Sequence, residues 1–426
     1  MRVLVVGNGA REDALSWRLA ESPSCEAIFA APGNAGTASR GENWEVAATD
    51  GKTLAQRSLD ERIDLAVLGP ETAIAAGVGD RLRDAGIAVF GPNRSGGRLE
   101  SSKIFAKRFM ERHGIPTARA IVVHSLEGAQ KALEEWKGAV VVKADGLAAG
   151  KGVVVMPNAE GTRALLHDWY EGARLPGGGS DILLEERLEG REVSVFALCD
   201  GRAIVPFGGA CDYKRAGDGD TGPNTGGMGA YSPPADFPDD LEDRVRERIL
   251  GPLLRGLLAE GETYIGVIYC GLMWNEFGPQ VIEFNARFGD PETQVLLPRI
   301  GGDFAGLLQS VAQGAMDLSL TTTSSQDCVG VVLATADYPR SNTPLAGLSP
   351  DVALDDGCRA FWGASRSVDG RVSTAGGRVL TVTALGDGLV QARSRAYHGV
   401  QQLAGRLGAD DLTYRTDIAS VPTLTP

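Results

Sequence analysis

Residues 140–155 read Val-Val-Val-Lys-Ala-Asp-Gly-Leu-Ala-Ala-Gly-Lys-Gly-Val-Val-Val. The valine runs at both ends predict strands, and the glycine-rich loop between them predicts a hairpin. A P-loop would place a helix after the glycines, so this layout favours a mobile lid that folds over a nucleotide triphosphate. Lys143 would project from the strand, while Gly150, Lys151 and Gly152 would present the loop to the phosphates. An ordinary exposed turn would explain the glycines but not two lysines beside apolar strands.

A second informative stretch, residues 281–293, reads Val-Ile-Glu-Phe-Asn-Ala-Arg-Phe-Gly-Asp-Pro-Glu-Thr. The two-residue period of a strand places Glu283, Asn285 and Arg287 on one face. Carboxylate and amide oxygens suit Mg²⁺ or Mn²⁺ bridged to phosphates, and Arg287 could neutralise a phosphoryl group in transfer. A solvated polar face is the alternative, but the apolar neighbours predict a core strand, where unpaired charge is costly.

The first hundred residues alternate between strands and helices, which predicts a parallel sheet with right-handed crossovers. We expect strands at 2–7, 26–31, 63–69 and 87–91, separated by helices at 12–21, 53–60 and 72–85. The turn from Gly7 to Glu12 exposes backbone N–H groups at a helix N-terminus, where a phosphate can bind. A nicotinamide cofactor is not expected, because the third glycine of the dinucleotide fingerprint is missing and no acidic residue ends a second strand near position 31.

The remaining sequence predicts an α+β block and a separate tail. We expect helices at 101–113, 126–136, 159–170 and 239–260, and strands at 118–123, 140–143, 152–156, 181–186, 192–199, 202–206, 266–274 and 280–284. After a linker candidate at 321–325, the tail predicts a strand at 328–334, hairpin-like pieces near 368–372 and 378–384, and a helix at 389–407. The expected domains are 1–100, 101–325 with a lid subdomain at about 118–189, and 326–426.

Composition narrows the range of partners. The 426 residues carry 55 Asp and Glu against 42 Lys and Arg, and the net charge of −13 disfavours binding to a nucleic-acid backbone. No stretch approaches the roughly 18 apolar residues of a membrane span. The six cysteines are scattered singly and the four histidines lie apart, so reduced core cysteines are expected and a zinc site is not. We expect a cytoplasmic protein that acts on small molecules as a monomer or homodimer.

Taken in order, the lid and the 281–293 stretch resemble the ATP-grasp ligases. Further stretches make the chain similar, over nearly its whole length, to the phosphoribosylamine-glycine ligases, also called glycinamide ribonucleotide synthetases. These stretches are 7–12 (GNGARE), 31–37 (APGNAGT), 69–71 (GPE), 99–103 (LESSK), 220–233 (DTGPNTGGMGAYSP) and 376–380 (GGRVL). The resemblance implies an ATP-grasp fold with an N-terminal parallel α/β domain, a central core with the lid, and a small C-terminal α+β domain.

The resemblance also implies a reaction of purine biosynthesis. ATP would phosphorylate the carboxylate of glycine, and the amine of phosphoribosylamine would attack the acyl phosphate to give glycinamide ribonucleotide, ADP and phosphate. No general base is demanded, because a neutral amine is already a competent nucleophile and positioning carries most of the barrier reduction.

The site residues follow from the same resemblance. ATP would contact Lys103, Lys143, Gly150, Lys151, Gly152, Glu185, Glu186, Leu188 and Glu192, and Glu283 and Asn285 would bind the metal. The amine substrate would meet Gly9, Ala10, Arg11, Glu12, Asn34, Gly36 and Glu71. The loop residues Asn224, Gly226, Gly227 and Met228 would form the floor of the site, with Arg287, Asp212 and Lys214 as catalytic residues.

The chain departs from the family pattern at four places. It has Asp13 for histidine, Cys211 for glutamine, residues 361–365 for His-Ala-Gly-Thr, and residues 419–422 for Gly-x-Arg-Ala. A carboxylate at position 13 would repel a phosphate at the nearby turn unless it points away. Besides neutral drift, two alternatives therefore stay open: an amide ligase with a different amine or acid, and a nucleotide-binding regulatory protein, against which the intact Arg287 argues.

Overall fold

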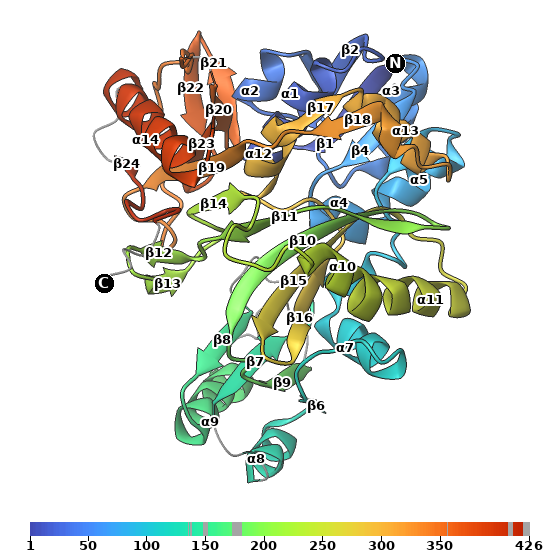
Figure 1. Cartoon of the computed structure of the whole chain (residues 1–426), viewed down its shortest axis with the longest axis vertical. Helices are drawn as coiled ribbons and strands as arrows, with labels where there is room; N and C mark the ends of the chain where they lie inside the picture. The colour runs from blue at the N-terminus through green and yellow to red at the C-terminus, as the bar shows by residue number, and fades with distance from the viewer. Residues whose placement is uncertain are drawn as a thin grey trace.

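The structure is a computed structural model that describes residues 1–134, 136, 139–147, 152–172, 181–355, 357–407 and 412–420. Its N-terminal part is a parallel five-stranded sheet in the order β3-β2-β1-β4-β5, coloured blue in Figure 1. The strands are β1 (Arg2–Gly7), β2 (Ala27–Pro32), β3 (Glu42–Asn43), β4 (Leu65–Leu68) and β5 (Ala88–Phe90). The helices are α1 (Ala10–Ala20), α2 (Ala35–Ala38), α3 (Gly51–Asp60), α4 (Glu71–Ala75) and α5 (Val78–Asp84).

The strand order reverses between β1 and β4, which pair in parallel. In open α/β sheets the crevice at such a reversal, beyond the carboxyl ends of the strands, is where ligands bind. The turns 7–12 and 69–71 both begin at this edge. The single helix expected at 72–85 is two helices, because Gly77 adopts a φ of 75° between α4 and α5.

The lid is a four-stranded antiparallel sheet in the order β6-β9-β7-β8, at the bottom of Figure 1. Its strands are β6 (Ala120–Val123), β7 (Val140–Ala144), β8 (Val153–Met156) and β9 (Ile182–Glu186), and its helices are α8 (Leu126–Glu134) and α9 (Ala159–His167). The lid has its own hydrophobic cluster, which includes Val142, Leu166 and Leu184. The hairpin expected from the valine runs is confirmed by the pairing of β7 with β8. Gly150 and Lys151 lie outside the described residues.

A large antiparallel sheet forms the centre of the molecule. Its strands run in the order β16 (Gly278–Asn285), β15 (Ile265–Asn275), β10 (Arg191–Asp200), β11 (Ile204–Asp212), β14 (Gly229–Ser232), β19 (Asp327–Thr335), β23 (Arg378–Gly386) and β20 (Cys358–Trp362), with β24 (Leu412–Thr413) beside β19. The pairing of β14 with β19 carries the sheet across residue 325, the expected domain boundary. The boundaries themselves stay a prediction.

Several connecting elements differ from the sequence expectation. The helix expected at 239–260 consists of α10 (Leu241–Val245), a π turn at Arg246–Leu250 and α11 (Gly251–Ala259). The linker candidate contains β18 (Thr321–Thr323), which pairs with β17 (Ile300–Gly302), because β-branched threonines suit a strand. Other elements are α6 (Arg98–Ser101), α7 (Lys103–Arg112), α12 (Thr293–Leu296), α13 (Phe304–Ala312) and α14 (Leu389–Arg406), with hairpins β12–β13 (Arg215–Gly217, Thr221–Asn224) and β21–β22 (Ser365–Val368, Arg371–Thr374).

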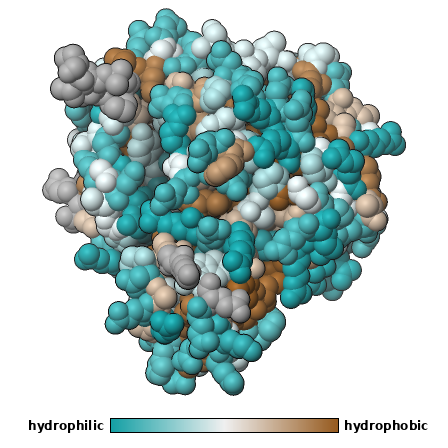
Figure 2. All heavy atoms as spheres, turned by 60° about the horizontal axis from the view of Figure 1, so that its bottom comes forward, coloured by the Kyte–Doolittle hydropathy of each residue, from teal (hydrophilic) through white to brown (hydrophobic). Residues whose placement is uncertain are grey.

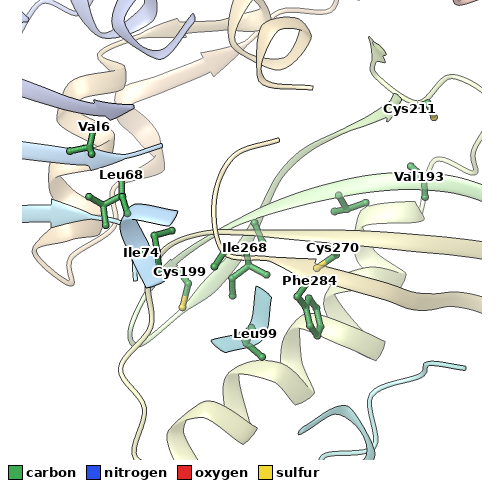
Figure 3. Packing of buried hydrophobic residues seen from close by; sticks show 14 of the residues in the cluster. Val6, Leu68, Ile74, Leu99, Val193, Cys199, Cys211, Ile268, Cys270 and Phe284 are labelled. Atoms are coloured by element: carbon green, nitrogen blue, oxygen red, sulfur yellow. The ribbon is translucent and has the colours of Figure 1, made fainter. Parts of the chain in front are cut away.

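One hydrophobic core joins the N-terminal sheet to the central sheet. Figure 3 shows Leu68 and Ile74 packed toward Leu99, Ile268 and Phe284, all nearly inaccessible to solvent. This shared core fixes the carboxyl edge of β1 and β4 relative to β16. Figure 2 shows a face on which hydrophilic residues predominate and hydrophobic ones form small separate patches. Among the described residues, no helix is long and apolar enough to span a membrane.

Candidate functional site

The turn after β1 is held by its own side chains. The Gly9 N–H donates to Glu12 Oε2 at 2.6 Å, and Arg11 Nε donates to Glu12 Oε1 at 2.6 Å. Glu12 lies against Gly69, where a Cβ would come within 2.1 Å of its Oε1, so this position requires glycine. Arg11 also donates to the Phe288 carbonyl at 3.1 Å. The turn is therefore rigid and is tied directly to the 281–293 stretch.

Asn34 supports the same turn from the side. Its Oδ1 accepts the N–H groups of Gly36 and Thr37, both at 2.9 Å. Its Nδ2 donates to the carbonyls of Asn8 at 3.1 Å and Gly9 at 3.0 Å. Because these bonds occupy both ends of the side-chain amide, a substrate contact here would fall to neighbouring backbone groups. The structure thus gathers Gly9, Ala10, Arg11, Glu12, Asn34 and Gly36 at one place, as expected from the sequence.

Arg287 joins the N-terminal sheet to the central sheet. Its guanidinium lies 3.3 Å from Glu71 of α4 and 2.9 Å from Glu100 of α6, and it donates to Asn285 Oδ1 at 3.1 Å. Burial alone would lower the pKa of Arg287, but the carboxylates of Glu100 and Glu71 have the larger effect. The net result is a pKa above the ordinary value, so the guanidinium stays charged. Glu100 was not anticipated as a site residue, although it lies in the 99–103 stretch. Glu100 and Arg287 lie 187 positions apart in the sequence, so a local sequence pattern cannot predict that they form an ion pair.

Glu283 faces a group of cations. Burial alone would raise its pKa, but Lys214, Lys143, Lys103 and Arg287 together lower it, so the carboxylate is ionised at neutral pH. Near these cations, the Glu283 carboxylate and the Asn285 amide oxygen form a pair of oxygen donors. This donor chemistry fits Mg²⁺ or Mn²⁺, which would keep water and phosphate oxygens as its other ligands.

Three lysines lie where the lid meets α7 and β16. Lys143 Nζ lies 2.5 Å from Glu185 Oε2 and donates to the Ile282 carbonyl at 3.0 Å. Lys107 Nζ lies 3.0 Å from the other oxygen of Glu185. Lys103 donates to the Gly146 carbonyl at 2.8 Å, and burial lowers its pKa. Lys107 was missed in the sequence, although its place four residues after Lys103 puts both on one face of α7.

The third group of predicted residues lies at the end of β11. Lys214 Nζ lies 2.7 Å from Glu192 and 4.0 Å from Asp212. The pKa of Asp212 is raised to about 7, mainly because the carboxyl group is buried. Lys214 lowers this pKa in part, while Glu292 and Glu192 raise it. Burial would lower the pKa of Lys214, but Asp212 and Glu192 raise it well above its ordinary value. Glu292, which accepts a hydrogen bond from Tyr269 at 2.9 Å, was not anticipated here.

The glycine-rich floor is held by the C-terminal part of the chain. Arg378 donates to the Gly226 carbonyl at 2.7 Å, to the Asp290 carbonyl at 3.0 Å and to Asp290 Oδ2 at 3.0 Å. The Tyr338 hydroxyl accepts the Gly226 N–H at 2.9 Å. Arg378 and Asp290 lie in quoted motifs, but neither was assigned a role from the sequence.

Not every predicted residue lies in these groups. Asn224 is exposed on the β12–β13 hairpin, where Arg215 donates to its side chain at 3.1 Å. Glu186 is exposed at the end of β9, Leu188 is partly exposed beyond it, and Met228 is buried below the floor. Gly152 precedes β8 at the edge of the lid. The roles of all these residues stay predictions.

Three family models match most of the chain, one after another. They are the N domain of phosphoribosylglycinamide synthetase at residues 1–100, its ATP-grasp (A) domain at 101–293 and its C domain at 328–421. The chain belongs to the phosphoribosylglycinamide synthetase family.

Members of this family resemble the chain over nearly its full length. It is 43% identical to the phosphoribosylamine--glycine ligase of Escherichia coli O157:H7, covering 98% of both chains. It is 44% identical to that of Phenylobacterium zucineum, covering 95% of this chain and 96% of the relative. The crystal structure of the Thermotoga maritima phosphoribosylamine--glycine ligase matches with a TM-score of 0.85 at 32% identity, covering 98% of this chain and 100% of the other. The predicted family is therefore confirmed.

The ATP-grasp fold extends to more distant proteins. The biotin carboxylase domain of the Hydrogenobacter thermophilus 2-oxoglutarate carboxylase, solved with MgADP and bicarbonate, matches with a TM-score of 0.74 at 15% identity, covering 97% of this chain and 91% of the other. At that identity the likeness concerns the fold alone. Together with the family's N, ATP-grasp and C domains, it confirms the predicted fold class.

Proposed function

We propose that the chain is an ATP-dependent carboxylate–amine ligase that joins phosphoribosylamine to glycine in purine biosynthesis. The observation that carries this function is the meeting of the turn after β1 with the end of β16. Arg11 reaches the Phe288 carbonyl and Arg287 reaches Glu71, so a phosphorylated amine at the turn would lie next to the phosphoryl-transfer residues. Family membership over the whole chain supports the same reaction.

ATP would bind between the lid and β16. Lys103 and Lys143 would neutralise its phosphates, since both lie on this side of the lid near Glu283. Glu283 and Asn285 would hold Mg²⁺ or Mn²⁺, which when bound neutralises phosphate charge and orients the terminal phosphoryl group. Glu185 to Leu188 would contact the adenine, and Glu192 the ribose.

The first chemical step would be attack of a glycine carboxylate oxygen on the terminal phosphorus of ATP, with ADP leaving. Arg287 would offset negative charge on the transferring group, because its ion pairs hold the guanidinium beside Asn285. In the second step the amine would attack the acyl carbon and phosphate would leave. The amine loses a proton in this step, and Asp212, with a pKa of about 7, can accept it.

The orientation of Asp13 favours the family's amine substrate over a different amine. Both of its carboxylate oxygens have partners within the protein: Oδ2 accepts the Trp362 N–H at 2.8 Å and Oδ1 pairs with Arg40 at 2.9 Å. The repulsion of a phosphate that Asp13 could have caused is therefore relieved. We also propose small-molecule substrates only, which the net charge of −13 supports, and a cytoplasmic location, which the six free cysteines support. A monomer or homodimer is proposed as well.

The test is a panel of carboxylic acids and amines that includes glycine and phosphoribosylamine. Phosphate release and product mass would be measured with purified protein, ATP and Mg²⁺. We expect release only with glycine and phosphoribosylamine together, with the mass of glycinamide ribonucleotide. A different productive pair would refute the assigned substrates, and no productive pair would refute the ligase.

A further inference from the structure

One residue of the C-terminal part is held by the N-terminal part through both of its backbone groups. The Trp362 N–H donates to Asp13 Oδ2 at 2.8 Å, across 349 positions of sequence. The Trp362 carbonyl accepts from Asn34 Nδ2 at 2.8 Å. We call this pair of hydrogen bonds, made by Asp13 and Asn34 to Trp362, the clasp.

The residues of the clasp are buried, and an aromatic contact lies close to them in the sequence. The rings of Trp17 and Phe361 lie 5.7 Å apart, and the Arg359 guanidinium lies 4.1 Å from the Trp17 ring centre. Asp13 itself has no exposed surface. Hydrogen bonds in such a dry place hold their geometry because water does not compete for them.

Asp13 is fitted into this place by its neighbours. A Cβ at Gly36 would come within 1.9 Å of Asp13 Oδ2, so the carboxylate needs a glycine there. Its Oδ1 pairs with Arg40 at 2.9 Å. Burial raises the pKa of Asp13, while Arg40 and the Trp362 N–H lower it only in part. The folded state thus disfavours the charge on Asp13. The residue therefore holds Trp362 in place at some cost to the stability of the folded protein.

The clasp is continuous with the substrate turn and with the floor. The Asn34 amide that binds Trp362 also donates to the Gly9 carbonyl. On the other side, Trp362 pairs with Leu380 in the β20–β23 ladder. Strand β23 begins at Arg378, which holds Gly226 and Asp290.

We propose that Asp13 is a positioning residue that sets β20 against the turn 7–12 and so fixes the pocket for the phosphate of the amine substrate. The effect on substrate binding rests on the proposed function, whereas the clasp itself does not. A phosphate held in the ground state contributes to the KM for the amine, whereas β16 and the lid, which would hold ATP, supply none of the hydrogen bonds of the clasp.

Four proteins test this: wild type, Asp13→Ala, Asp13→Asn and the control Leu82→Ala. Asparagine can still accept the Trp362 N–H, whereas alanine cannot. Leu82 is a fully buried residue of α5 with no part in the clasp, so its truncation loosens the same domain by a cavity alone. The measurements are KM for phosphoribosylamine and for ATP, and amide hydrogen exchange in residues 358–365.

For Asp13→Ala we expect KM for phosphoribosylamine to rise about tenfold and KM for ATP to stay within about twofold. Exchange at 358–365 should accelerate, and Asp13→Asn should recover most of both effects. Unchanged exchange in Asp13→Ala, or an equal KM rise in Leu82→Ala, would overturn the proposal. If wild type makes no product with phosphoribosylamine, the proposed function fails, and the exchange comparison still decides the clasp.

Discussion

Replacing Glu283 by glutamine is expected to stop the activation step while leaving the fold intact. The substitution keeps the size and one oxygen of the side chain and removes its charge. That charge is the one that Lys214, Lys143, Lys103 and Arg287 stabilise in the folded protein, as the lowered pKa of Glu283 indicates. In the variant these cations and the metal would lose their shared counter-charge.

The magnitude follows from Coulomb's law. Two unit charges 4 Å apart interact by about 4 kcal/mol at an effective dielectric constant of about 20, which is suitable near a partly buried strand end. Losing that amount from the transition state slows turnover by about a thousandfold. Side-chain relaxation can change this value, so we expect the kcat of Glu283→Gln to fall by about two to four orders of magnitude.

The effect on stability has a defined pH dependence. Because folding lowers the pKa of Glu283 below its ordinary value of 4.5, the ionised form stabilises the fold above that value. The contribution is lost as pH falls through the lowered folded-state pKa. Glu283→Gln should thus be less stable than wild type at neutral pH, and the difference should shrink in acid.

The assay is phosphate release with saturating substrates, with urea unfolding measured on the same samples. Glu276→Gln is the matched control, because Glu276 is exposed in the turn between β15 and β16. It should keep wild-type turnover and stability. Turnover of Glu283→Gln within about fivefold of wild type would refute both the metal role and the charge argument.

Three further predictions concern the other groups of the site. Lys143→Ala should raise the Kd for ATP as well as lower turnover, because the lysine meets charge already present in the ground state; equal ATP binding by calorimetry would count against its phosphate contact. Residues 140–147 and 152–156 of the lid should exchange their amide hydrogens more slowly once ATP and Mg²⁺ are added, and an unchanged rate would argue against closure. Wild-type kcat should fall as pH drops below about 7, where Asp212 becomes protonated, and Asp212→Asn should be slow without that acid limb; an unaltered limb in the variant would assign it to another group.

Local sequence patterns predicted the elements of this protein well. The valine runs of the lid, the alternating N-terminal elements and the strand carrying Glu283 all follow from side-chain periodicity, which depends only on near neighbours. Period 2 also predicted that Asn285 and Arg287 share a face, and the two are in contact. Charged residues inside an apolar strand were informative because they must be paired or functional.

What could not be predicted depends on contacts between distant parts of the chain. Glu100 and Arg378 act through partners far away in sequence, and the β14–β19 pairing joins two expected domains into one sheet. Strand register and partner choice are set by the whole fold, not by the strand itself. The hydrogen bond from Trp362 to the Asp13 side chain could not be predicted either, because only the folded chain brings these two residues together.

The acyl phosphate is the central chemical claim, and isotope transfer tests it directly. Glycine labelled with ¹⁸O in both carboxylate oxygens would be incubated with ATP, phosphoribosylamine and the purified protein, and the released phosphate analysed by mass spectrometry. Carboxylate attack on ATP followed by amine attack on carbon moves one labelled oxygen from glycine into phosphate. We expect one ¹⁸O atom in each phosphate released with product. Unlabelled phosphate released together with product would contradict activation through an acyl phosphate.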